Sequence, residues 1–381
     1  MPCKFEVICK PAGRSPHMEC CTIWVAYNLR CSVLVKQNGA GNRGWLYKYK
    51  SNLSSEGCQC TLHLHTSTIM SEGHRVAVYY QTQYDSSMAA NSPFGHYVSP
   101  LPLLTLITHL FLAAFHINSD KSVHLNDNAP EDPMFTQMWQ DLGQMQAQGV
   151  KVIGMLGGAA PGTYSLLSAD NFPTYYPILR NYISEFHLDG MDLDVEQSTP
   201  ISVIENLITQ LKADFGNDFI ITLAPVATAM TEGSNLSGFD YVTLDKAMGA
   251  QIAWYNVQFY SGFGSLFPDT QYIDIINFGY DPNRRVATIA SLVVAAVLTS
   301  PANGGGYISI DEVVSSAKDL SQKYGFNFGG INGWEYFNSL PDTTQPQEWA
   351  QTIKNAMANL TAAKREFEAS KRSQVWALSS L

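Results

Sequence analysis

The sequence predicts an α/β fold, a (β/α)8 TIM barrel, preceded by an irregular N-terminal extension. From residue 75 onward, eight short apolar runs alternate with longer amphipathic segments, the order expected of βα units repeated around a parallel sheet. All seven cysteines precede residue 61, so the barrel region must fold on its own core without disulfides. At 381 residues the chain is long enough for such a barrel of about 285 residues and an additional segment.

The eight apolar runs are rich in Val, Ile, Leu and Phe and carry few charges before their C-terminal ends, as strands buried on both faces do. In chain order they span residues 76–80, 109–115, 150–156, 190–195, 219–223, 252–258, 293–298 and 329–334. Helical patterns lie between and after them, at 134–148, 201–215, 310–324 and 348–360. An open doubly wound sheet is the weaker alternative, because Tyr79-Tyr80-Gln81-Thr82 follows the first run instead of a glycine-rich phosphate turn.

Residues 1–72 have no sustained period of 2 or 3.6, and no fold is assigned to them. Soft metal ligands gather there at Cys58, Cys60, His63 and His65, but no second pair follows at finger-like spacing, so we expect no metal site. The alternative to a metal-binding segment is that residues 1–72 are a disordered or non-native extension. In that case Met70 is another possible start of the protein. The expected organisation is given by the ranges 1–72 (extension), 73–360 (barrel) and 361–381 (tail).

Composition excludes several classes of partner. Lys and Arg number 23 against 33 Asp and Glu, and a net charge of −10 makes nucleic acid an unfavourable ligand. No apolar stretch reaches the length of a membrane span, and no signal-peptide core of about 7 to 15 apolar residues opens the chain. We therefore expect a cytoplasmic protein as written, or an extracellular one if the N-terminus is misassigned. Aromatic residues make up 12%, which suits either sugar stacking or a Tyr-rich core.

Three acidic residues occupy every second position of the fourth predicted strand: Asp192, Asp194 and Glu196, here called the carboxylate ladder. Side chains alternate along a strand, so all three point one way, towards the barrel axis, while the apolar residues between them point to the helices. Unpaired buried charges cost several kcal/mol each, so at least one acid must hold or share a proton. Glu196, nearest the C-terminal end, is the expected proton donor. A calcium or magnesium site stays open as an alternative.

The ladder lies within a longer motif, Asp189-Gly-Met-Asp192-Leu-Asp194-Val-Glu196, which resembles the DGxDxDxE signature of glycoside hydrolase family 18, the chitinases and their relatives. Asn256-Val-Gln258-Phe-Tyr260 is similar to the family's QFY segment, and Gly330-Ile-Asn-Gly-Trp334-Glu-Tyr336 to its eighth-strand Trp motif. The resemblance covers residues 75–360 and does not extend to 1–72.

This resemblance implies retaining hydrolysis without a protein nucleophile and without a cofactor. Glu196 would protonate the glycosidic oxygen while the substrate's own 2-acetamido oxygen attacks the anomeric carbon. Asp194 would orient the acetamido N–H, and Asp192 would hold or share the proton of Asp194. The remaining roles implied are a hydrogen bond to the acetamido carbonyl (Tyr260), substrate binding (Gln258, Trp334, Tyr80 and Phe115) and structural support (Asp189, Gly157 and Gly158). Taken alone, Trp334 and Tyr260 would more often be core residues.

The third strand departs from the family pattern, which often has SxGG, because Met155 stands in the serine position before Gly157 and Gly158. This puts hydrogen-bonding support of the ladder in doubt. The resemblance also implies non-proline cis peptides at Ala114–Phe115 and Trp334–Glu335.

The expected function is that of an endo-acting chitinase, a monomer that cuts chitin or N-acetylglucosamine oligosaccharides and needs no membrane or nucleic-acid partner. An endo-β-N-acetylglucosaminidase acting on N-glycan cores is the alternative with the same chemistry. From another class comes an inactive carbohydrate-binding barrel. Relatives of that kind lose an acid of the ladder, so the complete ladder and Tyr260 favour the enzyme.

Overall fold

The structure is a computed structural model that describes residues 33–34, 46–47, 74–278 and 291–357. The chain divides into two units, Met1–Ile69 and Met70–Leu381. In the first, β1 (Val33–Leu34) pairs antiparallel with β2 (Leu46–Tyr47). The four soft ligands singled out in this unit, from position 58 to position 65, lie outside the described residues.

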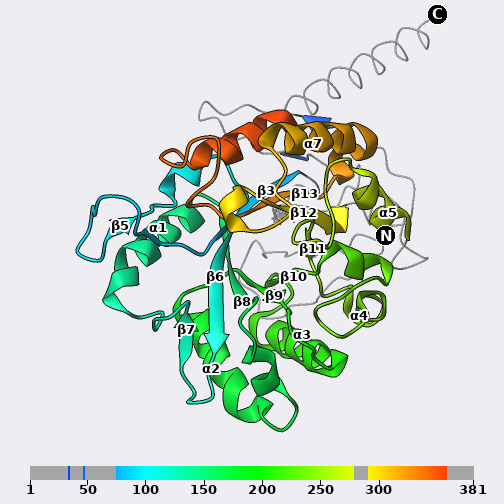
Figure 1. Cartoon of the computed structure of the whole chain (residues 1–381). Helices are drawn as coiled ribbons and strands as arrows, with labels where there is room; N and C mark the ends of the chain where they lie inside the picture. Colours follow the sequence, from blue (N-terminus) through cyan, green and yellow to red (C-terminus); the bar gives the residue numbers. More distant parts are fainter. Residues whose placement is uncertain (1–32, 35–45, 48–73, 279–290, 358–381) are drawn as a thin grey trace, which may run out of the picture. The chain divides into compact units, whose positions relative to one another are not determined.

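The second unit contains a closed barrel of eight parallel strands, which confirms the predicted fold class (Figure 1). The strands are β3 (Arg75–Tyr80), β6 (His109–Ile117), β8 (Lys151–Gly157), β9 (Gly190–Asp194), β10 (Ile220–Leu223), β11 (Trp254–Gln258), β12 (Val293–Leu298) and β13 (Gly330–Trp334). Each pairs with its neighbour in chain order, and β3 closes the barrel by pairing with both β13 and β6. All eight predicted runs overlap these strands, with ends that differ by no more than two residues.

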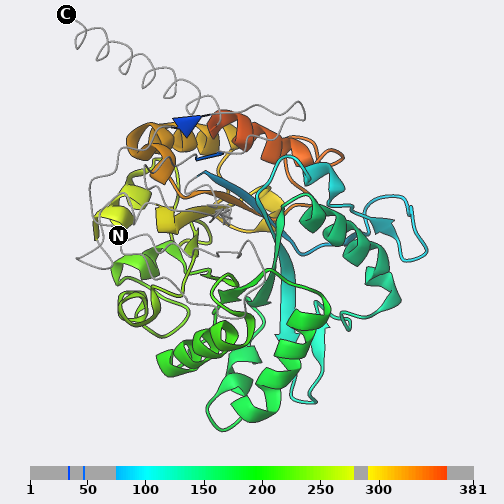
Figure 2. The same cartoon turned by 180° about the vertical axis from the view of Figure 1, so that it is seen from behind.

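Helices surround the strands, as Figures 1 and 2 show from opposite sides. They are α1 (Thr136–Ala147), α2 (Phe172–Glu185), α3 (Ile201–Phe215), α4 (Tyr241–Met248), α5 (Thr270–Phe278), α7 (Ile310–Tyr324) and a last helix over 347–357. The predicted helices 201–215 and 310–324 match α3 and α7, and residues 358–360 of the last predicted helix lie outside the described ranges. No helix in the described part of the chain is both long enough and apolar enough to span a bilayer.

Shorter elements join the barrel units. The hairpin strands are β4 (Tyr84–Asp85) with β5 (His96–Tyr97), and β7 (Val123–Leu125), which runs antiparallel to β6. The 3-10 helices are η1 (Leu101–Leu103), η2 (Pro133–Phe135), η3 (Thr163–Leu167), η4 (Ala227–Thr231), η5 (Pro301–Asn303) and η6 (Gly325–Asn327).

The alternation of side chains along the strands separates two apolar clusters. One fills the barrel interior and includes Phe111, Met155 and Trp254. The other lies between the strands and the helices and includes Leu193 on β9 and Leu207 on α3. Interior and outer packing therefore follow the parity of each strand, as expected for a small closed barrel.

Strand β6 breaks this alternation at a bulge. Leu112 pairs with Gly154 on β8, whereas Phe115 pairs with Leu156, so β6 advances three residues while β8 advances two. The extra residue moves Phe115 from the interior face to the outer one, where it joins the cluster beneath the helices. The cis peptide here joins Ala113 to Ala114, so the predicted position one residue later is wrong; the predicted cis bond after Trp334 is confirmed.

Candidate active site

The ladder occupies the C-terminal end of β9, inside the barrel mouth. Asp192 is 0% exposed and Asp194 is 6% exposed, whereas Glu196, two residues beyond the strand, is only half-buried. The intervening Met191 and Leu193 belong to the outer cluster. The segment therefore places its acids and its apolar residues on opposite faces, with Glu196 nearest to solvent.

Asp192 is held by donors from three other strands. It accepts hydrogen bonds from the Tyr79 hydroxyl on β3 (2.8 Å), the Thr222 hydroxyl on β10 (2.5 Å) and the Asn256 amide on β11 (3.1 Å). Burial raises the pKa of Asp192, and these three donors oppose that rise because they favour the charged form. Asp192 is thus fixed in one position at the base of the ladder.

Among the described residues, Asp194 has a single side-chain donor, the amide of Gln258 on β11. The Gln258 Nε2 lies 3.2 Å from Asp194 Oδ1, 3.2 Å from Glu196 Oε1 and 2.9 Å from the carbonyl oxygen of Ala224. Burial, followed by the negative charges of Glu196 and Asp192, raises the pKa of Asp194 well above its usual range. Gln258 therefore bridges the two upper acids, and the raised pKa of Asp194 favours its protonated form.

No hydrogen bond joins Asp192 to Asp194 in the described structure, so the two carboxyl groups interact here through charge and not through a shared proton in direct contact. No ion pair within the described ranges links a ladder carboxylate to a Lys, Arg or His side chain. Nor do three His, Cys, Asp or Glu side chains anywhere in those ranges form a group suited to a metal ion. The ladder is an unneutralised cluster of acids.

Tyr260 and Trp334 lie at the rim, each partly exposed. The Tyr260 hydroxyl has no hydrogen-bond partner among the described residues, and burial, together with the charges of Asp194 and Glu196, raises its pKa well above the usual range. Trp334, at the end of β13, packs edge-on against Tyr79, with ring centroids 5.2 Å apart. Both polar groups, the Tyr260 hydroxyl and the Trp334 indole N–H, are therefore available to a ligand.

Gly157 and Gly158 let β8 approach the ladder closely. Both have positive φ, and a Cβ atom on Gly157 would lie 2.5 Å from the carbonyl oxygen of Asp194. The Gly158 N–H donates to that same oxygen at 2.9 Å. A side chain at position 157 would push Asp194 out of place, which fits the predicted structural role of the two glycines.

The two other predicted substrate contacts, Tyr80 and Phe115, are wrong for this structure. They are 0% and 1% exposed and lie in the outer cluster. Tyr80 shares its strand face with Val76 and Val78, and its hydroxyl donates to the carbonyl of Val98. Phe115 is turned outward by the bulge in β6.

Sequence reasoning missed the three donors to Asp192. Strand parity holds the signal for each: Tyr79 takes the face opposite to Val78, and Asn256 takes the face of Gln258. Thr222 is a polar residue in the middle of an apolar strand, directly beside Asp192 in the register of β10 and β9. Such inward polar residues mark an interior site.

Met155 replaces the serine of the family pattern and lies buried beside Asp192 in the register of β8 and β9. A thioether cannot supply the hydroxyl donor that a serine would. The donors from β3, β10 and β11 hold Asp192 without it. The missing serine thus removes one possible hydrogen-bond donor to the ladder, and three other donors to Asp192 remain.

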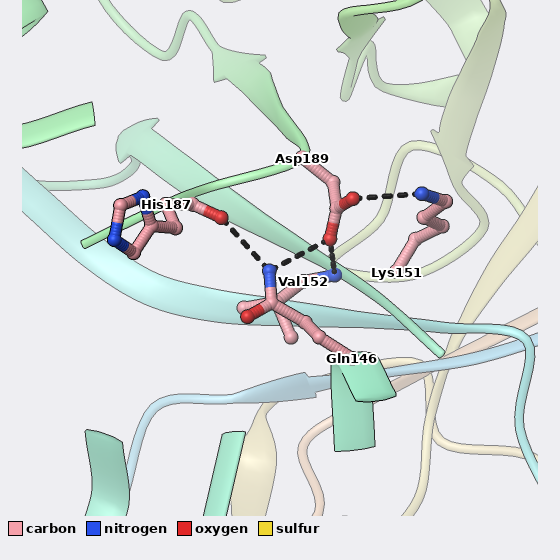
Figure 3. A network of polar contacts seen from close by, with 5 residues as sticks. All are labelled: Gln146, Lys151, Val152, His187 and Asp189. Atoms are coloured by element: carbon pink, nitrogen blue, oxygen red, sulfur yellow. Dashed lines mark hydrogen bonds and ion pairs between the residues drawn. The ribbon is translucent and has the colours of Figure 1, made fainter. Parts of the chain in front are cut away.

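Asp189 belongs to a separate network at the opposite edge of the barrel (Figure 3). Its carboxylate pairs with the Lys151 ammonium (2.8 Å) and accepts from the Gln146 amide (2.9 Å) and the Val152 N–H (3.0 Å). These contacts join β8, α1 and the start of β9. They match the structural role predicted for Asp189.

Comparisons with known proteins agree with this geometry. The model of the glycosyl hydrolases family 18 matches residues 75–272. Chitinase 2 of Rhizopus oligosporus is 26% identical over 213 residues, which cover 51% of this chain and 35% of that protein. Chitinase 1 of Rhizopus niveus is 25% identical over 240 residues, 59% of this chain and 45% of that one. The chain thus spans less than half the length of these two relatives.

Two solved structures are more similar in sequence. A fungal endo-β-N-acetylglucosaminidase of family 18 is 46% identical, with a TM-score of 0.67 over 74% of this chain and 97% of that one. The chitinase ChiC from Aspergillus fumigatus is 41% identical, with a TM-score of 0.63 over 74% of this chain and 99% of that one. With a family model that matches half of its length and these likenesses across the barrel, the chain belongs to glycoside hydrolase family 18.

Proposed function

We propose that this chain hydrolyses β-1,4 linkages between N-acetylglucosamine units of chitin or chito-oligosaccharides, within the chain and with retention of configuration. The observation that supports this most is the intact ladder: two buried acids, a third at the rim, and an unpaired Tyr260 hydroxyl beside them. Such a set suits a reaction in which a proton is given at one point and positive charge is stabilised at another.

In the first step, Glu196 donates its proton to the glycosidic oxygen, because it is the ladder acid nearest to solvent and to an entering substrate. The carbonyl oxygen of the substrate's 2-acetamido group attacks the anomeric carbon as the bond to the leaving sugar breaks. The electron pair of that bond goes to the protonated oxygen, and an oxazolinium ion remains. The Trp334 indole supports this sugar from below.

Asp194 accepts a hydrogen bond from the acetamido N–H and stabilises the positive charge on the oxazolinium ring. Asp194 can accept this bond only after its own proton has passed to Asp192. No hydrogen bond joins the two acids here, so Asp194 has to turn towards Asp192 for that transfer. The Tyr260 hydroxyl donates to the acetamido group and holds it for the attack. Water then opens the ring from the face of the departed sugar, and Glu196 takes the proton from that water.

An endo-β-N-acetylglucosaminidase acting on N-glycan cores is the second candidate, favoured by the 46% identity with a fungal enzyme of that name. The bond and its chemistry are the same, and only the sugars beyond it differ. An inactive binding protein is less well supported, because every acid of the ladder is present.

The test is Glu196→Gln, compared with Glu185→Gln, an exposed glutamate at the end of α2. On a chromogenic chito-oligosaccharide we expect the first variant to lose about 10²- to 10⁴-fold in kcat, the range for a general acid, and the second to lose nothing. Retained turnover in Glu196→Gln would reject Glu196 as the acid. Mass spectrometry of products from chitin and from a high-mannose glycopeptide separates the two enzyme candidates.

A further inference from the structure

One loop at the mouth of the barrel contacts the main chain at both Tyr260 and Trp334. It comprises residues 303–306, Asn303 followed by three glycines, and is here called the glycine loop. The loop follows β12, and β12 lies between β11 and β13 in the barrel. Because Tyr260 follows β11 and Trp334 ends β13, the order of the strands places this one segment beside both residues.

On one side, Asn303 holds the main chain at Trp334. Its Nδ2 donates to the carbonyl oxygen of Trp334 at 2.9 Å and to the Thr299 hydroxyl at 3.2 Å. Its Oδ1 accepts from the amide of Asn338 at 2.5 Å. Both polar atoms of the Asn303 amide are thus engaged, so the side chain is fixed in one orientation against the end of β13.

Thr299, which directly follows β12, holds the same part of the main chain. Its N–H donates to the carbonyl oxygen of Trp334 at 2.8 Å, and its hydroxyl donates to the carbonyl oxygen of Glu335 at 2.6 Å. The Trp334 carbonyl therefore accepts from two donors. Removal of the Asn303 amide leaves the Thr299 donor in place, so we expect an Asn303 variant to fold.

On the other side, Gly305 and Gly306 lie against the main chain at Tyr260. The Ser261 N–H donates to the carbonyl oxygen of Gly305 at 2.8 Å. A Cβ atom on Gly306 would lie 3.1 Å from the Ser261 nitrogen and 3.2 Å from the Tyr260 Cα, and Gly306 has a φ of +83°. A side chain at position 306 would therefore press on the main chain that carries Tyr260.

These main-chain contacts matter because the two aromatic side chains have few restraints of their own. The Tyr260 hydroxyl has no hydrogen-bond partner among the described residues, and the Trp334 ring packs edge-on against Tyr79. The position of each ring is therefore set mainly by its main chain. In the described structure no hydrogen bond joins the glycine loop to the ladder acids, so the loop contacts the site at these two residues.

We propose that the glycine loop fixes the distance between the Tyr260 hydroxyl and the Trp334 ring, with Asn303 and Gly306 as its positioning residues. This rests on the proposed function, in which Tyr260 holds the acetamido group of the same sugar that lies on Trp334. The acetamido oxygen attacks within that sugar, so its path to the anomeric carbon depends on both contacts at once. A misplacement of about 1 Å can cost about 10²-fold in rate.

The test compares Asn303→Ala and Gly306→Ala with Asn91→Ala. Asn91 is a matched control because its amide also braces a loop, by donating to and accepting from the main chain of Tyr97 in the β4–β5 hairpin. On a chromogenic chito-oligosaccharide we expect kcat of the first two variants to fall about 10- to 100-fold, and the control to keep the wild-type value. Wild-type kcat in Asn303→Ala would overturn the assignment.

Double variants show whether the loop acts through these two residues. In a Trp334→Ala background, Asn303→Ala should lower kcat/KM by no more than about twofold, because the ring that it positions is already gone. Gly306→Ala should behave in the same way in a Tyr260→Phe background. Losses that multiply with those of the single variants would show a general disturbance of the barrel and would contradict the proposal.

A spectroscopic readout separates this inference from the proposed reaction. In protein labelled with fluorotryptophan, the fluorine NMR signal that disappears in Trp334→Phe belongs to Trp334. Asn303→Ala should shift or broaden this signal and leave those of Trp139 on α1 and Trp254 on β11 in place. If the signal moves while wild-type turnover is absent, the proposed hydrolysis fails and the positioning role stands. An unmoved Trp334 signal in an active protein would overturn the positioning role alone.

Discussion

Four carboxylates lie within eight residues of one another around β9, and the two ends of this segment treat them in opposite ways. At the N-terminal edge, Asp189 has a lysine partner and two N–H donors. At the C-terminal edge, Asp192 and Asp194 are more deeply buried, and no Lys, Arg or His among the described residues forms an ion pair with them. Asp189 is neutralised to hold the barrel together, whereas the ladder is left with charges that compete for protons. The same residue type thus has a structural role at one end and a chemical role at the other.

The two ends of this segment also have opposite effects on the stability of the fold. An acid whose pKa is raised by folding binds its proton more tightly in the folded state, so stability falls as the pH rises from the unfolded pKa, about 3.9 for Asp, through the folded one. Asp192 and Asp194 are in this situation. At neutral pH the ladder therefore weakens the fold that Asp189 strengthens.

Asp194→Asn tests the chemical role of the C-terminal end of β9, and it has the largest expected effect of the variants compared below. The amide keeps the bond from Gln258 but cannot become negative beside the oxazolinium ion. We expect kcat to fall by about 10²- to 10³-fold, as for loss of one preorganised electrostatic group. Steady-state kinetics on a chromogenic chito-oligosaccharide measure this, and a kcat within threefold of the wild type would exclude Asp194 from the reaction.

Tyr260→Phe removes the free hydroxyl at the rim and leaves its ring. A hydrogen bond to a charged group contributes about 1.5–3 kcal/mol, so kcat/KM should fall by about 10- to 150-fold. Stability should hardly change, because the hydroxyl has no partner in the described structure. A loss of thermal stability in place of activity would assign Tyr260 to packing.

Asp189→Ala tests the structural end. The change leaves the Val152 N–H and the Gln146 amide without this acceptor, and we expect a loss of about 1–3 kcal/mol in the free energy of unfolding. Lys151→Met should cost less, about 0–1 kcal/mol, because the lysine side chain is 39% exposed and water screens the ion pair. Denaturant titration measures both. A large fall in kcat of the folded Asp189→Ala protein would show that the two ends are not separate.

Tyr79→Phe makes the smallest change, one donor fewer at Asp192. That donor lowers the pKa of Asp192, so its removal raises the pKa further, and the acidic limb of the kcat profile should move to higher pH. Tyr80→Phe, whose hydroxyl donates to a main-chain carbonyl in the outer cluster, is the matched control and should leave the profile unshifted. Equal shifts in both variants would contradict the assignment of Tyr79 to the site.

Sequence periodicity was sufficient for the barrel, because buried parallel strands and amphipathic helices leave strong local patterns. It was also sufficient for the alternation of the ladder, which depends on strand parity alone. Phe115 could not be placed, since a bulge in β6 reverses parity without a clear mark in the residues. The donors to Asp192 come from three strands that are distant in sequence, and only the closure of the barrel brings Tyr79, Thr222 and Asn256 together.

The acids of the ladder have no cationic partner in the described structure, and we expect them to lower the free energy of unfolding at neutral pH. The most direct measurement is the free energy of unfolding of wild type and Asp194→Asn as a function of pH. Asp194→Asn should be the more stable protein at pH 7, because folding raises the pKa of Asp194 and so disfavours its charged form, and the two curves should converge as the pH falls towards 4. A wild type that is more stable at pH 7, or a difference that does not change with pH, would contradict the claim.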